Sequence, residues 1–223
     1  AEGMTDCPAC QALVQQMLTP DDGGPFAIRF QIRQKVVGIG APKDPSMGRD
    51  FAGVVEAVGK KVTRFKVGDR VFGGANGAFA EYVVRGETGS IALMPANASF
   101  EQAAAVPVAA ITALQALRDS GKLQAGQKVL INGASGGVGT YAVQIAKSMG
   151  AEVHGVNSTR NVELVLGLGA DRVFDYKKEN YTESEERYDL IVDMVGNHSL
   201  LDNSKVMKST GRLVQVGGPS GDW

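Results

Sequence analysis

Histidine and cysteine, which are common ligands of zinc, are scarce in this sequence of 223 residues. It contains two histidines, His154 and His198, and both of its cysteines lie within the first ten positions. Catalytic zinc generally needs about three protein ligands, and structural zinc is bound by about four cysteine or histidine side chains. The pair Cys7 and Cys10 has the spacing of a redox couple or of half a zinc site, but no strand pattern precedes it and no second pair completes it. We therefore expect no metal, and at the two cysteines we expect oxidative reactivity without a functional role.

Excess charge and a long apolar run are also missing. Lys and Arg total 23 and Asp and Glu total 24, so a formal net charge of −1 gives no field that would attract nucleic acid or an anionic membrane. The most apolar stretch, residues 101–117, is broken by Pro107 and is shorter than the roughly 18 residues that a membrane-spanning helix needs. No signal-peptide pattern is visible at the start, which makes a cytoplasmic location the default expectation. A chain of this length with 43% hydrophobic residues can bury the cores of two small domains.

The most informative stretch is residues 129–139, an apolar run that passes into a glycine-rich loop and then into the helical pattern of residues 140–149. A helix N-terminus presents unpaired N–H groups and a partial positive charge, so it holds a pyrophosphate without a cationic side chain. In the G-x-G-x-x-G frame of dinucleotide-binding proteins, Ala134 replaces the first glycine, whereas Gly136 and Gly139 are retained. We expect this loop to bind a dinucleotide, the alternative being that it is only a connector. The loop residues are Ala134, Ser135, Gly136, Gly137, Val138 and Gly139.

Short β-branched runs alternate with amphipathic helical patterns after this loop. Such alternation is typical of a parallel, doubly wound sheet, so this half of the chain is predicted to be an α/β domain of the Rossmann type. The charged residues 177–187 are predicted to form a solvated connector. The expected strands are residues 152–156, 172–174, 190–195 and 212–216, and the expected helices lie around residues 162–168 and 200–208.

The end of the second strand indicates which dinucleotide is bound. NAD-binding proteins carry an acid about 20 residues past the glycine loop, where it accepts hydrogen bonds from the ribose hydroxyls. Here the chain reads Asn157-Ser158-Thr159-Arg160, with two hydroxyls and a guanidinium but no carboxylate. These groups suit a 2′-phosphate, so NADP(H) is preferred over NAD(H). The alternative is that Ser158 caps the following helix while Arg160 points to solvent, and both interpretations can hold together.

Several ordered motifs precede the loop. Residues 54–58, 70–72 and 79–84 are short apolar or alternating runs between glycine turns, and they predict a second, β-rich unit. The alanine-rich residues 101–117 are expected to form helices that lead into the nucleotide-binding domain. The motifs that carry a family resemblance are residues 48–59, 65–72, 77–82, 103–107 and 112–117. Through them, the chain resembles the medium-chain dehydrogenase/reductase superfamily and, within it, the zinc-free, quinone oxidoreductase-like branch. The resemblance covers roughly residues 34–223.

This resemblance implies a fold and a domain order. The β-rich unit corresponds to part of the superfamily's GroES-like barrel domain, placed at residues 34–115, and the NADP-binding Rossmann domain to residues 116–223. Zinc-dependent relatives carry a histidine and a glutamate where this chain has Arg49 and Asp50. Because a guanidinium stays protonated, Arg49 cannot ligate a metal.

The resemblance also implies a reaction without a metal. Hydride passes from NADPH to a quinone or to the β-carbon of a conjugated carbonyl (an enone), and such a reaction needs no dedicated nucleophile, so no catalytic residue is nominated. Asp50 and Thr112 are candidates that line the cleft, although Asp50 is equally well explained as a surface or turn carboxylate. Tyr176 matches a position that packs near the adenosine phosphate, where a tyrosine equally serves packing. Further cofactor-binding candidates follow the last two strands, namely Gly196, Gly217 and Gly218.

The two ends of the chain depart from the family pattern. Residues 1–33 show no barrel-strand pattern, and the chain stops after the fifth Rossmann strand, whereas relatives continue with a sixth. We therefore expect a truncated or divergent chain with an unpaired sheet edge, which a second copy completes in a possible homo-oligomer. The alternative function is a dinucleotide-binding module that does not turn over. Short-chain dehydrogenases are disfavoured because no tyrosine has a lysine four positions later.

Overall fold

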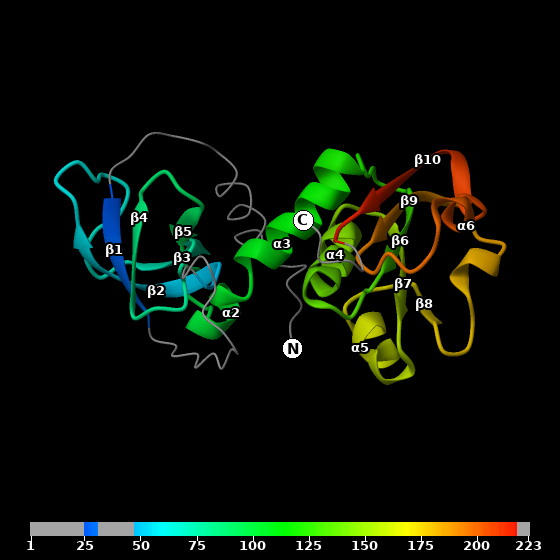
Figure 1. Ribbon diagram of the computed structural model, residues 1–223, viewed down its shortest axis with the longest axis horizontal. Helices are drawn as coiled ribbons and strands as arrows, with labels where there is room; N and C mark the ends of the chain where they lie inside the picture. The colour runs from blue at the N-terminus through cyan, green and yellow to red at the C-terminus, as the bar shows by residue number, and fades with distance from the viewer. Residues whose placement is uncertain (1–24, 31–46, 218–223) are drawn as a thin grey trace. The chain divides into compact units, whose positions relative to one another are not determined.

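A computed structural model describes the backbone of residues 25–30 and the full residues 47–217. Cys7, Cys10 and Gly218 lie outside the described residues. Two compact units divide between Val108 and Ala109, inside helix α3 (Pro107–Leu114) (Figure 1). We call them the N-terminal unit and the C-terminal unit.

The N-terminal unit is a five-stranded sheet in the order β4-β1-β2-β3-β5, in which every neighbouring pair is antiparallel. Its core gathers apolar side chains from β2, β3 and the intervening loops, including Phe51, Val55 and Val71. This is the partial GroES-like domain that the sequence predicts. The strands are β1 (Pro25–Phe30), β2 (Asp50–Val58), β3 (Arg70–Gly74), β4 (Tyr82–Gly86) and β5 (Ile91–Leu93).

Strand β1 shows that one expectation was wrong, because residues 1–33 do carry a barrel strand. Its backbone pairs with both β2 and β4, which places it inside the sheet rather than at an edge. In sequence, Phe26, Ile28 and Phe30 alternate with Ala27 and Arg29, which is the period-two pattern of a strand. The pattern is short, and pairing with two strands that come later in the chain makes it a strand.

Two short helices follow the sheet. Helix α2 (Phe100–Ala104) begins with a capping box in which Ser99 and Gln102 each bond the other's backbone N–H. Helix α3 begins at Pro107, which breaks the alanine-rich run as the sequence predicts, and it passes into a π-helical segment, Gln115–Ser120.

The C-terminal unit is a five-stranded parallel sheet in the order β10-β9-β6-β7-β8. The chain enters at the central strand, winds to one side through β7 and β8, and returns through β9 to the other side. This confirms the doubly wound Rossmann prediction. The strands are β6 (Lys128–Asn132), β7 (Glu152–Asn157), β8 (Arg172–Asp175), β9 (Tyr188–Asp193) and β10 (Met207–Gln215), and the helices are α4 (Gly137–Ser148), α5 (Val162–Gly167) and α6 (Leu200–Ser204).

Both faces of this sheet are covered, which explains its continuous apolar strands. On β6, Val129 and Ile131 belong to the core that includes residues of α3, α4 and α5, whereas Leu130 belongs to a second core on the opposite face. Strand β9 divides in the same way, because Leu190 contributes to the first core and Ile191 to the second. Parallel strands buried on both faces lose the alternation of polar and apolar residues.

Two predicted segments of this unit need correction. The helix expected over residues 200–208 ends at Ser204, because Val206 is fully buried and Met207 already pairs with Tyr188 in the sheet. The connector at residues 177–187 is not wholly solvated: the side chain of Tyr181 is 2% exposed and its hydroxyl donates to Asn203 Oδ1 at 2.8 Å. In both segments a tertiary contact overrides the local pattern.

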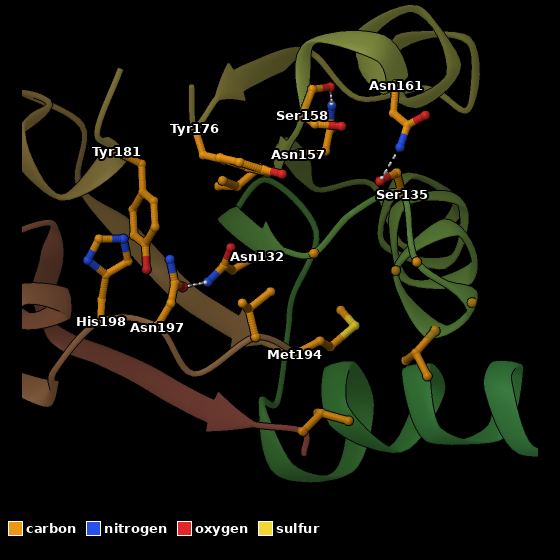
Figure 2. A pocket seen from close by; sticks show the side chains of 18 of the residues that line it. Asn132, Ser135, Asn157, Ser158, Asn161, Tyr176, Tyr181, Met194, Asn197 and His198 are labelled. Carbon is orange, nitrogen blue, oxygen red and sulfur yellow. Dashed lines mark hydrogen bonds between the residues drawn. The ribbon is translucent and has the colours of Figure 1, made fainter. Parts of the chain in front are cut away.

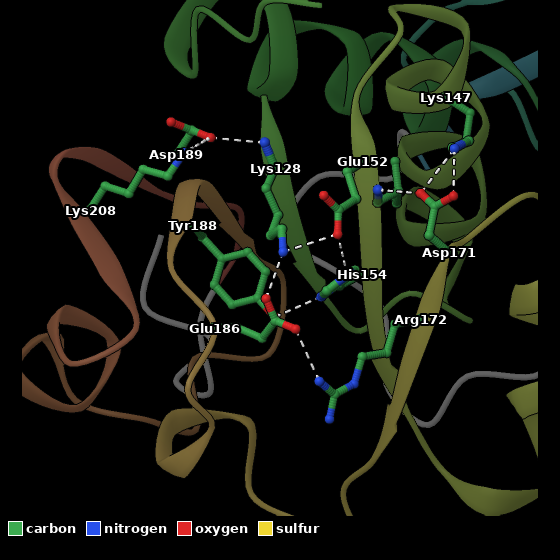
Figure 3. A network of polar contacts seen from close by, with 11 residues as sticks. Lys128, Lys147, Glu152, His154, Asp171, Arg172, Glu186, Tyr188, Asp189 and Lys208 are labelled. Carbon is green, nitrogen blue, oxygen red and sulfur yellow. Dashed lines mark hydrogen bonds and ion pairs between the residues drawn. The ribbon is translucent and has the colours of Figure 1, made fainter. Parts of the chain in front are cut away.

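The amino ends of the parallel strands carry a network of charged and polar side chains (Figure 3). Lys128 Nζ lies 2.6 Å from Glu186 Oε2 and 3.0 Å from Glu152 Oε1, and Arg172 Nη1 lies 3.1 Å from the other Glu186 oxygen. The buried imidazole of His154 lies 2.9 Å from the Tyr188 hydroxyl and 3.1 Å from Glu152 Oε1. Burial lowers the pKa of His154 below its ordinary value. This network links the amino-terminal ends of β6, β7, β8 and β9 to one another.

Strand β10 forms one edge of the sheet, and within the described ranges no strand pairs with its outer side. In the same ranges, no helix combines the length and the apolar character that crossing a membrane requires.

Candidate functional site

A cavity of about 930 Å³ opens at the carboxyl ends of the five parallel strands (Figure 2). It is lined by the last residues of β6 and β7, which are Asn132 and Asn157. The residues that directly follow β8, β9 and β10 line it too: Tyr176, Met194 and Val216. An open α/β sheet binds its ligand at this edge, beside the point where the strand order reverses.

The glycine loop between β6 and α4 forms one wall of the cavity. Gly133 turns the chain with φ +90°, and Gly136 is the N-cap of α4 without any side chain to bond the first helical N–H groups. A Cβ on Gly139 would lie 2.1 Å from the Gly133 carbonyl oxygen, so only glycine lets the helix approach the loop this closely. A Cβ on Gly137 would meet no atom within 4 Å. The start of α4 therefore faces open space with uncovered N–H donors, which suits an anionic group.

Ala134, where the usual frame has its first glycine, is fully buried. Its side chain belongs to the first core of the C-terminal unit, not to the surface of the cavity. An ideal Cβ on Gly155 of β7 would lie 2.9 Å from the Ala134 methyl group. The alanine is accommodated because residue 155 opposite it is a glycine.

A second wall is the turn between β7 and α5. Ser158 is the N-cap of the 3-10 turn Thr159–Asn161, but its side chain makes no capping hydrogen bond. Arg160 lines the cavity and forms no ion pair with any described residue. Asn161 Nδ2 donates to Ser135 Oγ at 3.0 Å and so ties this turn to the glycine loop. A hydroxyl and a guanidinium are thus both available to a ligand at the end of β7.

Thr159 takes a different part from its neighbours. Its hydroxyl donates to Asp175 Oδ2 at 2.6 Å, and the residue does not line the cavity. This hydrogen bond is the main cause of a lowered pKa at Asp175, which also accepts the N–H of Lys177 at 3.1 Å. Thr159 therefore joins the ends of β7 and β8 to each other.

A third wall is the turn that follows β9, held by Asp193. Its Oδ1 atom accepts the N–H groups of Val195 at 3.0 Å and Gly196 at 2.9 Å, and also Nδ2 of Asn132 at 2.9 Å. The same Asn132 nitrogen donates to Asn197 Oδ1 at 2.9 Å. Asp193 and Asn132 thus fix this turn against the end of the central strand.

Comparisons with known proteins agree with this geometry. A family described as "Alcohol dehydrogenase GroES-like domain" matches residues 30–116, and one described as "Zinc-binding dehydrogenase" matches residues 137–222. A solved quinone oxidoreductase from Pseudomonas syringae is 33% identical with a TM-score of 0.74, over 92% of this chain and 70% of that one. This chain belongs to the quinone oxidoreductase-like family of medium-chain dehydrogenases/reductases.

Two curated relatives of this chain are longer than it is. A quinone oxidoreductase from Mus musculus is 38% identical over 181 residues, which are 76% of this chain and 54% of the mouse protein. A 2-methylene-furan-3-one reductase from Solanum lycopersicum is 37% identical over 183 residues, covering 77% of this chain and 46% of that protein. The chain thus spans about half the length of these relatives.

The remaining candidates from the family resemblance are dispersed. Tyr176 lines the cavity with a side chain that is 58% exposed. Gly196 supports the cavity wall through its N–H without lining it, and neither Gly217, which follows β10, nor Thr112 of α3 lines it. In the N-terminal unit, Asp50 accepts the N–H of Val108 at 2.9 Å near the start of α3, and burial raises its pKa. A helix-capping role accounts for this carboxylate.

The two histidines of this quinone oxidoreductase-like chain lie in different places. His198 lines the cavity and packs edge-on against Tyr181 with ring centroids 4.9 Å apart, whereas His154 belongs to the network at the amino ends of the strands. Among residues 25–30 and 47–217, no group of three or more metal-ligating side chains comes together. Arg49, which stands where zinc-dependent relatives carry a histidine, donates a hydrogen bond to Asn76 Oδ1 at 2.9 Å.

Sequence reasoning missed several cavity residues. Their shared feature is a position at, or shortly after, the carboxyl end of a parallel strand, which is a signal that the strand predictions already contained. The missed polar residues are Asn132, Asn157, Asn161, Glu179, Asn180, Tyr181, Asn197 and His198.

Proposed function

We propose that the cavity of the C-terminal unit binds a nicotinamide dinucleotide. One observation carries this proposal: the start of α4, which has no side-chain cap, lines the same cavity as Ser158 and Arg160. The space in front of Gly137 fits a pyrophosphate held by backbone N–H groups, and the volume of about 930 Å³ lies in the range typical of cofactor pockets.

NADP(H) is the preferred dinucleotide. Residues 157–160 offer no carboxylate to the ribose and no negative charge to repel a 2′-phosphate. The Arg160 guanidinium pairs with phosphate oxygens, and the Ser158 hydroxyl, free of a capping bond, donates a further hydrogen bond. Thr159 is left out of this set because its hydroxyl is bound by Asp175.

The reaction we propose is transfer of hydride to a quinone or to the β-carbon of an enone, without a metal. Bound NADPH supplies the hydride. The chain's own residues hold the pyrophosphate at the start of α4, hold the 2′-phosphate at the end of β7, and keep the wall after β9 in place. The names of the mouse and tomato relatives support a quinone or a conjugated ketone as the acceptor.

A titration of the purified chain with NADPH and with NADH tests this proposal. Intrinsic fluorescence or calorimetry follows binding, and absorbance of the reduced nicotinamide then follows turnover after a quinone or an enone is added. We expect tighter binding of NADPH than of NADH, and oxidation of NADPH that depends on the acceptor.

Other outcomes assign a different function. Binding of NADPH without acceptor-dependent oxidation identifies a dinucleotide-binding module that does not turn over. A folded chain that binds neither cofactor refutes the assignment of the cavity.

A further inference from the structure

One buried polar atom at the cavity has no partner. Asn157, the last residue of β7, lines the cavity and is only 3% exposed. Its side-chain Nδ2 donates to the Ser158 carbonyl oxygen at 2.9 Å, but its Oδ1 is buried and accepts no hydrogen bond from the described residues. Only one other side-chain atom in the described ranges, Nε of Arg85, shares this condition. A buried acceptor without a donor destabilises the fold, so its retention beside a cavity needs an explanation.

The orientation of the Asn157 amide follows from its one hydrogen bond. Exchanging the nitrogen and oxygen would place Oδ1 against the Ser158 carbonyl oxygen, and two acceptors facing each other repel. The atom left over is therefore the acceptor, and its missing partner is a donor. In Figure 2 the amide lies between Tyr176 on one side and the Asn161–Ser135 pair on the other. The last torsion of an asparagine is broad, so the planar amide can turn by a small angle that moves Oδ1 toward the cavity and shifts Nδ2 by the same angle, within reach of the Ser158 carbonyl.

The carboxylate at the end of the neighbouring strand β8 already has hydrogen-bond partners. Asp175, at the end of β8, accepts from Thr159 and from the N–H of Lys177, and it lies 3.4 Å from the ammonium group of Lys178. Asn157 occupies the strand end at which NAD-binding sheets carry an acid that accepts from ribose hydroxyls. A neutral amide also accepts such a hydrogen bond, and unlike a carboxylate it does not repel a 2′-phosphate held by the adjacent residues.

We propose that Oδ1 of Asn157 accepts a hydrogen bond from the 3′-hydroxyl of the adenosine ribose, which makes Asn157 a binding residue that serves NADPH and NADH alike. This inference rests on the proposed function, because it assumes that the cavity holds the adenosine half of a dinucleotide. The 3′-hydroxyl is the donor chosen because NADPH carries a phosphate on the 2′-oxygen, which leaves the 3′-hydroxyl common to both cofactors.

Calorimetric titration with two small ligands tests the hydrogen bond directly. ADP and 3′-deoxy-ADP differ only in the proposed donor, and each is titrated into the native chain and into Asn157→Leu, which has a similar shape but no acceptor. We expect loss of the hydroxyl to weaken binding by about 3- to 10-fold in the native chain and to leave the affinity of Asn157→Leu unchanged. 2′-Deoxy-ADP is the matched control, and its loss of affinity is expected to be the same in both proteins.

The outcomes separate this inference from the function on which it rests. Equal penalties for 3′-deoxy-ADP in both proteins, or a penalty difference that appears with 2′-deoxy-ADP instead, overturn the inference alone. A folded native chain that binds no ADP overturns the proposed function and this inference with it.

A second variant decides the matter if Asn157→Leu does not fold. Asn157→Asp keeps an acceptor in place of Oδ1 but sets its second oxygen against the Ser158 carbonyl, which lowers stability. In the folded variant the 3′-deoxy penalty is retained, while affinity for 2′,5′-ADP falls more than affinity for ADP because the new charge repels the 2′-phosphate. Loss of the 3′-deoxy penalty in this variant contradicts the inference.

Discussion

The methyl group of Ala134 occupies space that Gly155 leaves open on the neighbouring strand. A Cβ added to Gly155 would lie 2.9 Å from that methyl group and 2.8 Å from Cγ1 of Val165. Real Cβ atoms do not approach so closely, so the two positions are coupled: an alanine at the start of the loop requires a glycine in β7. The substitution of the first glycine of the frame is therefore compensated within the core and not at the cavity surface.

Gly155→Ala is expected to lower the free energy of unfolding by about 1–3 kcal/mol, because the added methyl group overpacks the contact with Ala134 and Val165. Urea unfolding followed by circular dichroism measures the change. Gly167→Ala in α5 is the matched control: a Cβ there meets no atom within 4 Å, and alanine favours a helix more than glycine does, so stability should stay the same or rise slightly. Equal losses in both variants would show that the effect does not come from this contact.

The sequence was sufficient to predict the elements that depend on local chemistry. The glycine loop, β6 and α4 are examples, because a positive φ at Gly133 and a close approach at Gly139 are demands that only glycine meets. The amphipathic or apolar periods of β7 and α5 are likewise visible without tertiary information.

The missed features depend on partners far along the chain. Strand β1 exists through its pairing with β2 and β4, and α6 ends where Met207 pairs with Tyr188. Thr159 belonged to the predicted phosphate-binding set, but Asp175, 16 residues later, takes its hydroxyl. Local patterns contain no information on which donor a distant carboxylate will bind.

Arg160→Ala is expected to weaken NADPH binding by roughly 10- to 150-fold, because a charge-assisted hydrogen bond to the 2′-phosphate contributes about 1.5–3 kcal/mol. NADH, which lacks that phosphate, should bind with nearly unchanged affinity. Direct titration with both cofactors measures the ratio. Arg187→Ala serves as the control, because that arginine lies beside the amino end of β9 and donates to the Glu186 carbonyl. Equal weakening of NADPH and NADH in Arg160→Ala would refute the assignment of the 2′-phosphate to this residue.

Gly136→Val is expected to abolish measurable binding of both cofactors while the chain stays folded. The extended backbone of Gly136, with φ −78° and ψ 174°, suits valine, and the nearest atom to an added Cβ is 3.3 Å away. The new side chain instead covers the start of α4, the proposed binding site of the pyrophosphate. Gly139→Ala is the contrasting variant, since its Cβ would collide with the Gly133 oxygen and lower the melting temperature. Unchanged cofactor affinity in Gly136→Val would mean that the loop is only a connector.

The buried imidazole of His154 predicts a pH dependence of stability. Burial, partly offset by the nearby Glu186 and Glu152 carboxylates, holds its pKa below the ordinary value of 6.5, so the unfolded chain takes up this proton at a higher pH than the folded chain does. Stability is therefore fully present above that ordinary value and is lost as the pH falls from there toward the pKa of the folded state. Urea unfolding at a series of pH values between about 5 and 7 measures this slope.

His154→Gln isolates the contribution of that imidazole. Glutamine does not titrate, so the slope of stability against pH in this range should become smaller in the variant. Two carboxylates at this end of the sheet have lowered pKa values and titrate below this pH range: Glu186, and Asp189, whose Oδ2 accepts the N–H of Lys128 at 2.9 Å. An undiminished slope would assign the dependence to another group.

The three hydrogen bonds that converge on Oδ1 of Asp193 have a consequence for the thermodynamics of binding. They fix the turn after β9 as part of the folded state, so a ligand that enters the cavity does not have to order that turn. Immobilising a long side chain costs about 0.5–1.5 kcal/mol of conformational entropy, and Arg160, which is exposed, lines the cavity and has no ion pair with a described residue, bears this cost when a ligand binds it. Part of the unfavourable entropy of cofactor binding is therefore expected to arise in the turn that we propose distinguishes NADPH from NADH.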